Sequence, residues 1–208
     1  VEELRQKGLD KSCPLCRKPL PPGPDKLRDL GIRMLLNVSR AFARSHPGGG
    51  IGPTDPWPAL PAKQQQEMEE ALAMLREAAD QGHVEAQLWC GDMYTFGHGA
   101  VKDDSLAFIY TEKAAQQGHQ GAQYNMAEKH ASGIGCEQDY KRAAEWYEKT
   151  VRQEGGDPNH GGDPNAIDAM QSLGELYLRG LGVPQSNDRA RKWFEKAANL
   201  GDARAAYI

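Results

Sequence analysis

The chain has 208 residues, of which 39% are hydrophobic and 26% are charged, a balance typical of folded, soluble proteins. It carries 25 Lys and Arg against 29 Asp and Glu, a net charge of −4, without a long run of positive residues. This composition argues against general nucleic-acid binding, which needs clustered cations. No apolar run approaches the roughly 20 residues of a membrane span, and no signal peptide is seen.

The first stretch of interest, residues 10–24, contains a Cys-x-x-Cys pair formed by Cys13 and Cys16. A structural zinc ion needs four ligands, and no other Cys or His lies between Val1 and Cys13. Two alternatives need no zinc: an ordinary turn and a redox-active pair. The other cysteines, Cys90 and Cys136, do not make a secreted disulfide framework. We therefore expect a reducing compartment, the cytoplasm or the nucleus.

The motif Cys-Pro-Leu-Cys-Arg with a trailing Pro-Leu-Pro resembles the closing turn of a RING-type zinc finger, over about the first twenty residues. The resemblance implies that residues 1–24 are the end of such a domain and that its other ligands precede Val1. Cys13 and Cys16 would be its last two zinc ligands. By the same resemblance, Pro14 and Leu15 would contact a ubiquitin-conjugating enzyme, and Arg17 would hold the charged ubiquitin. We expect zinc in the full-length parent and no stable zinc binding in this fragment.

Residues 25–62 connect this motif to the rest of the chain, and they begin with an amphipathic helix over residues 25–46. Apolar residues recur there at helical spacing: Leu27, Leu30, Met34, Leu35, Val38 and Phe42. We expect this helix to pack on the first repeat; the alternative is contact with a partner helix or a second copy. Residues 46–63 include five prolines and four glycines and predict a linker. Trp57 in that linker either tucks against a neighbouring surface or forms a short recognition motif.

Internal repeats occupy residues 63–208. The glycine pair Gly97 and Gly99 recurs 36 residues later at Gly133 and Gly135, and 47 residues after that at Gly180 and Gly182. The extra eleven residues fall in the polar insertion at residues 153–165. We expect a half-unit at residues 63–82, repeats at about 83–118, 119–165 and 166–201, and a broken unit at 202–208. Because the last unit breaks off inside a helix and Val1 is not a methionine, both ends look cut.

Each unit predicts two closely packed helices. Alanines recur in both, at Ala86, Ala122, Ala169 and Ala205 in the first helix and at Ala71, Ala107, Ala143 and Ala190 in the second. Such small residues allow close approach, and the Gly-x-Gly between the helices permits a sharp turn. Asp103, Asp139 and Ser186 stand where the second helix needs an N-cap. His130 replaces the tyrosine found at Tyr94 and Tyr177, and is expected to pack.

The spacing A-x2-G-x3-A-x4-G-x2-Y-x2-G-x-G, followed by an A-x6-A-A helix, resembles the Sel-1-like repeat, a relative of the tetratricopeptide repeat. The middle copy departs from it at His130 and at Thr150-Val151. The resemblance implies an all-α fold, a right-handed α-solenoid, and a scaffold that binds peptides or protein partners. An unrelated helical bundle is the alternative.

One column of the first helix suggests a binding surface. Asp92, Glu128 and Glu175 hold the same position in three units. Three residues earlier, on the same helical face, come Trp89, Asn125 and Ser172. We expect these helices to line the concave side and to form an acidic, partly aromatic stripe that binds a basic peptide. The alternative is a solvated helix face.

The histidines do not form a catalytic or metal-ligating pattern in the sequence. His83 and His119 are equivalent positions just before a helix, which indicates a structural role. Cys90 and Cys136 are typical of small buried residues. A Cys/His pair that meets only in space stays open as an enzyme alternative.

These observations predict an adaptor for protein–protein interaction. In the parent it would be the partner- or substrate-binding arm of a RING-type ubiquitin ligase, which acts by proximity. The rival hypothesis is a pure repeat adaptor with an incidental Cys-x-x-Cys.

Overall fold

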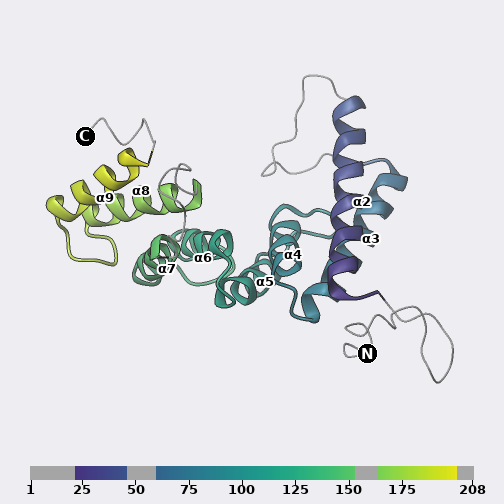
Figure 1. Cartoon of the computed structure of the whole chain (residues 1–208), viewed down its shortest axis with the longest axis horizontal. Helices are drawn as coiled ribbons and strands as arrows, with labels where there is room; N and C mark the ends of the chain where they lie inside the picture. Colours follow the sequence, from purple (N-terminus) through teal and green to yellow (C-terminus); the bar gives the residue numbers. More distant parts are fainter. Residues whose placement is uncertain (1–21, 46–59, 153–163, 201–208) are drawn as a thin grey trace.

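A computed structural model describes residues 22–45, 60–152 and 164–200, and within them every regular element is an α-helix. The helices follow one another along a curved chain (Figure 1). Their bounds are α2 (Pro24–Ser45), α3 (Ala62–Asp80), α4 (Val84–Phe96), α5 (Asp104–Gln116), α6 (Gln120–Ser132), α7 (Tyr140–Arg152), α8 (Pro164–Arg179) and α9 (Asn187–Asn199). None of these described helices is long and apolar enough to cross a bilayer.

The helices pair and stack as an α-solenoid, as the repeats predicted. The pairs α4/α5, α6/α7 and α8/α9 each form one unit, and α5 contacts α6 as α7 contacts α8. Each unit therefore buries its open face against the next, which is how solenoids build a continuous core. The motif at Cys13–Arg17, the linker with Trp57 and the residues beyond Leu200 lie outside the described residues.

The turns inside each unit have the predicted chemistry. Gly97 and Gly133 end α4 and α6 in the left-handed conformation, both with φ of 74°. Asp103 then caps α5 by accepting from the amides of Ser105 and Leu106. Asp139 and Ser186 accept from backbone amides in the first turns of α7 and α9 in the same way. These caps satisfy amides that the helix itself leaves unpaired.

The histidines before α4 and α6 are also caps. Nδ1 of His83 accepts from the amide of Ala86, and Nδ1 of His119 accepts from that of Ala122, each at 3.3 Å. Their equivalence in the repeat therefore has the structural cause that the sequence indicated.

The second glycine of each turn allows adjacent units to touch. Gly135 has φ of +75°, and a Cβ there would lie 2.1 Å from the carbonyl oxygen of Asp104 in the preceding unit. A Cβ at Gly99 would likewise lie 2.5 Å from the carbonyl oxygen of Met68, and one at Gly182 would lie 2.3 Å from the carbonyl carbon of Tyr140. A side chain at this column would thus force the units apart.

The alanine columns form the centre of the core. Within the described residues, every alanine of the two columns is at most 2% exposed: Ala86, Ala122 and Ala169, and Ala71, Ala107, Ala143 and Ala190. His130 is buried where other units have tyrosine, with its ring edge-on to Phe108 at 5.5 Å. The prediction that His130 packs is confirmed.

The helix α2 completes the first unit, where the sequence had predicted α3 as a lone second helix. A Cβ at Gly31 would meet Leu75 and the carbonyl of Ala71, just as a Cβ at Gly91 would meet Thr111 and the carbonyl of Ala107. The two partner positions are 36 residues apart, so α2 packs on α3 as α4 packs on α5. Leu27, Leu35 and Val38 are buried, and Leu30 and Met34 are half-buried. The side chain of Phe42 is outside the described set.

Polar contacts tie α2 to the start of α4. Arg28 forms an ion pair with Glu85, and Nε2 of His83 lies 3.2 Å from Oδ1 of Asp25. Because the carboxylate of each pair is exposed, these pairs add little stability, and burial on α3 is what holds α2.

Candidate functional site

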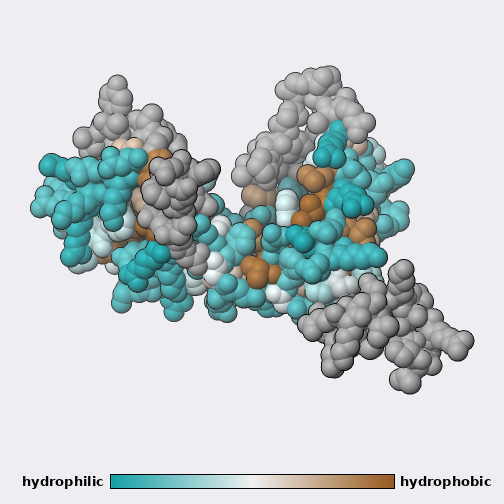
Figure 2. Space-filling model, in the orientation of Figure 1, coloured by the Kyte–Doolittle hydropathy of each residue, from teal (hydrophilic) through white to brown (hydrophobic). Residues whose placement is uncertain are grey.

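The first helices of the units, α4, α6 and α8, form the inner face of the curve. Helices α6 and α8 contact each other directly across the unit boundary, beside their contacts with α7. In Figure 1, helices α2 and α3 stand at one end of the curve and α8 and α9 at the other, with α4 to α7 between them. Figure 2 shows the surface hollowed between these two ends. The predicted stripe lies on these inner helices.

Glu128 is the member of the stripe that accepts a hydrogen bond from a neighbouring helix. Its side chain is exposed, yet its Oε1 accepts a hydrogen bond from the hydroxyl of Tyr147, a residue of α7 that is only 2% exposed. The ring of Tyr147 lies 6.0 Å from that of Tyr124 on α6. Two tyrosines and a carboxylate thus meet at the junction of α6, α7 and α8.

The same carboxylate changes the acidity of both phenols. Burial raises the pKa of Tyr147, and the hydrogen bond and charge of Glu128 raise it further, while Ser172 lowers it. Burial and the charges of Glu128 and Asp168 likewise raise the pKa of Tyr124. Both phenols therefore stay neutral at pH 7.

Asp92 and Glu175, the other acidic members, have different partners. Asp92 on α4 is half-buried next to Lys129, whereas Glu175 on α8 is exposed and pairs with Arg179 at 2.5 Å, one turn along the same helix. Pairs of this exposed i,i+4 type are weak and open easily. The acidic stripe is thus continuous in position but uneven in available charge.

The second predicted column is half-buried throughout. Trp89 packs against the core that α2, α3 and α4 share, and Ser172 is close enough to Tyr147 to influence its pKa. Asn125, which holds the equivalent position in the middle unit, is half-buried on α6. Whether the two columns bind a ligand stays a prediction.

Lys129 is a feature that the sequence reading missed. It occupies the column of Met93 and Leu176, both buried apolar residues, and is itself only 6% exposed. Its Nζ lies 3.2 Å from Oγ1 of Thr95 on the neighbouring first helix. A lysine in an otherwise apolar repeat column was the signal that could have revealed this buried contact between units.

The pKa of Asp92 makes stability depend on pH. Burial raises this pKa from 3.8 to about 6, although Lys129 lowers it. Because the folded chain then binds more protons than the unfolded chain, this group's contribution to stability falls as pH rises through 4–6 and stays reduced above.

We therefore compare the free energy of unfolding of Asp92→Asn with that of the parent. The difference, variant minus parent, should be about 1 kcal/mol more positive at pH 7.5 than at pH 5. Urea unfolding at the two pH values measures this difference. A difference of the opposite sign would show that the Lys129 charge outweighs burial.

A Cys/His pair does meet in space. Sγ of Cys136 lies 3.5 Å from Nδ1 of His130. Burial lowers the pKa of His130 and raises that of Cys136, so both are neutral at pH 7. A neutral thiol is a poor nucleophile. Among the described residues there is no group of three or more His, Cys, Asp or Glu that could hold a metal ion.

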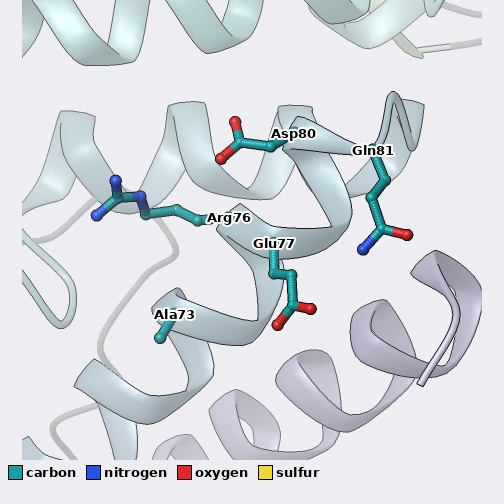
Figure 3. Close-up of a pocket in the computed structure, with 5 residues that line it drawn as sticks. All are labelled: Ala73, Arg76, Glu77, Asp80 and Gln81. Carbon is teal, nitrogen blue, oxygen red and sulfur yellow. The ribbon is translucent and has the colours of Figure 1, made fainter. Parts of the chain in front are cut away.

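A shallow hollow lies along α3. It is lined by Ala73, Arg76, Glu77, Asp80 and Gln81. In Figure 3, Arg76 and Asp80 point to one side of the helix and Glu77 to the other. The hydroxyl of Tyr110 donates a hydrogen bond to Asp80 at 3.5 Å and also contacts Arg76. These contacts explain why Arg76 and Asp80 point to the same side. Arg76 and Asp80 thus contact Tyr110 on α5, and the lining groups do not converge on one point.

Comparison with known families agrees with this architecture. The model of the Sel1 repeat matches residues 63–83, 84–119, 121–154 and 167–202, more than half of the chain. The chain belongs to the Sel1 repeat family. Sel1 repeat proteins are scaffolds that bind protein partners.

A solved Sel1 repeat structure has a similar fold. A Sel1 repeat protein from Oxalobacter formigenes is 30% identical, with a TM-score of 0.52, over 65% of this chain and 93% of that one. Cysteine rich protein B of Helicobacter pylori is 20% identical, with a TM-score of 0.49, over 68% of this chain and 94% of that one. No curated protein matches the chain.

Proposed function

We propose that this Sel1 repeat scaffold binds a basic segment of a protein partner on its inner face, and that Glu128 is the central contact. The observation that carries the proposal is an exposed carboxylate held in place by a buried tyrosine hydroxyl.

The tyrosines fix the carboxylate of Glu128 in a position from which it can bind a cation. A carboxylate fixed by hydrogen bonds loses little further freedom when it binds, which favours affinity. The phenols are neutral donors, so they orient the carboxylate without cancelling its charge. The half-buried ring of Tyr124 adds an aromatic surface beside it, and such surfaces attract Lys and Arg side chains.

The rest of the stripe extends the site along the inner face. Asp92 and Glu175 lie one unit away on either side of Glu128. An extended segment with spaced cations could therefore contact two or three acidic positions in turn. The labile pair between Glu175 and Arg179 can exchange for a pair with a partner's cation.

The test is binding of a fluorescein-labelled decapeptide of alternating Arg and Gly, followed by anisotropy. We expect Glu128→Lys with Glu175→Lys to abolish binding, and Glu128→Gln alone to weaken it about tenfold, because a charged hydrogen bond is worth about 1.5 kcal/mol or more.

The matched control reverses two exposed glutamates of second helices, Glu145→Lys with Glu195→Lys, and should retain binding. If the inner-face variant keeps both its affinity and its salt dependence, the stripe is only a solvated surface.

We also propose the finer assignment of this scaffold as the arm of a RING-type ubiquitin ligase. It rests on Cys13, Cys16 and the residues around them, which would hold zinc and contact a ubiquitin-conjugating enzyme. Sequencing the transcript upstream of Val1 tests it. Six further Cys or His at cross-brace spacing would support a ligase, whereas a methionine just before Val1 would contradict it.

A further inference from the structure

The second helices of the last two units carry a concentration of positive charge that the whole chain does not share. The chain has a net charge of −4, but α7 and α9 each contain four Lys or Arg against two Asp or Glu. Six exposed cations on these helices define what we call the basic ridge: Arg142, Lys149 and Arg152 on α7, and Arg189, Lys192 and Lys196 on α9.

The ridge residues share one helical face. On α7 the second and third cations follow the first by seven and ten residues, and on α9 they follow by three and seven. These spacings return to the same side of a helix. Moreover, Arg142 and Arg189 are equivalent repeat positions, as are Lys149 and Lys196. Both helices therefore present their part of the basic ridge in the same orientation.

Aromatic rings hold several of these cations in place. Nζ of Lys149 lies 3.8 Å from the ring centroid of Trp146, and Nζ of Lys196 lies 4.4 Å from that of Trp193. Cζ of Arg189 lies 5.5 Å from the ring centroid of Tyr177. Each ring positions its cation while leaving the charge exposed, which prepares the ridge for an anion.

Packing explains only part of the ridge, since α5 also carries a lysine, Lys113, over the ring of Tyr110 in the column of Lys149 and Lys196. The second helix of the preceding unit, α5, packs in the same way with Leu106 and Gln116 where α7 has Arg142 and Arg152. Among the described residues, acidic neighbours pair with two of the six cations: Arg152 pairs with Glu148 at 2.9 Å, and Arg142 lies 3.6 Å from Asp139. These are exposed pairs that a partner's carboxylate can replace.

We propose that the basic ridge docks an acidic segment of a partner protein, a stretch with several spaced Asp or Glu. Exposed glutamates interrupt the ridge, Glu145 on α7 and Glu195 on α9. Separate cationic points suit separate carboxylates, whereas the continuous charge of a phosphate backbone would meet these glutamates. The ridge lies on α7 and α9 and does not depend on the inner face.

The experiment uses a fluorescein-labelled decapeptide of alternating Glu and Gly, titrated with the full chain at low salt. We expect the triple variant Lys149→Glu, Lys192→Glu, Lys196→Glu to weaken binding at least tenfold. The corresponding Lys→Arg triple variant should retain affinity. A charge-matched control on exposed lysines elsewhere, Lys26→Glu, Lys63→Glu and Lys102→Glu, should change affinity less than twofold.

Three results would overturn the proposal. The parent chain could fail to bind the acidic peptide, or the control variant could lose as much affinity as the ridge variant. A single-stranded DNA decamer could bind more tightly than the peptide and lose affinity in the ridge variant, which would make the ridge a nucleic-acid site. The inner-face variant Glu128→Lys, Glu175→Lys should still bind the acidic peptide, so this proposal and the proposed function fail separately.

Discussion

Replacing Gly135 by alanine is expected to lower the free energy of unfolding by about 3 kcal/mol. The residue has a positive φ, which costs an L-residue with a side chain about 1–2 kcal/mol. The new Cβ would also lie 2.1 Å from the carbonyl oxygen of Asp104 and 3.0 Å from Cβ of Phe108. Because backbone cannot rotate away as a side chain can, α5 and α6 must shift apart, at a further cost of about 1–3 kcal/mol.

Gly82 provides the matched control for this prediction. It also has a positive φ, 91°, but no atom lies within 4 Å of the position that a Cβ would take. Gly82→Ala should therefore show the conformational cost alone, about 1–2 kcal/mol. Urea unfolding followed by circular dichroism measures both variants. Equal losses would mean that the close approach between units has no energetic weight.

Replacing Gly31 by leucine is expected to destabilise the chain by about 2–3 kcal/mol. A Cβ at this position would lie 2.8 Å from Cγ of Leu75 and 3.1 Å from the carbonyl oxygen of Ala71, and both of those residues are fully buried. The larger side chain should lift α2 from α3. Amide hydrogen exchange should then accelerate in α3, because that helix loses its cover.

Leu36 on the same helix is the control for Gly31. Its side chain is 42% exposed, so Leu36→Ala should change stability by only about 0.5 kcal/mol. If Gly31→Leu is as mild as this control, α2 does not serve as the first helix of a repeat unit.

The repeat fold was predictable because its constraints recur. Alanine and glycine columns, the Gly-x-Gly turns and the N-caps appear at constant spacing, and each has a local physical cause. The pairing of α2 with α3 was harder to predict. Gly31 precedes Gly91 by 60 residues instead of 36, and α2 continues past the place where the other first helices turn.

The stripe was predictable in position but not in chemistry. Repeat spacing placed Asp92, Glu128 and Glu175 in one column. It could not show that Tyr147 reaches Glu128 from α7, because the equivalent positions hold Thr111 and Phe194. The lysine in an apolar column pointed to a buried cation at Lys129, but not to its partner Thr95, which lies 34 residues earlier in the preceding unit. Contacts that occur in one unit only are not visible in a repeat pattern.

The most direct test of the inner-face claim is to map binding by NMR, with the alternating Arg/Gly decapeptide added to the isotope-labelled chain. Binding at the proposed site predicts that the largest chemical-shift changes fall on α4, α6 and α8, centred on Glu128, and weaken with added salt. Changes confined to the second helices α5, α7 and α9, or no changes at all, would contradict the claim that the inner face binds a basic segment.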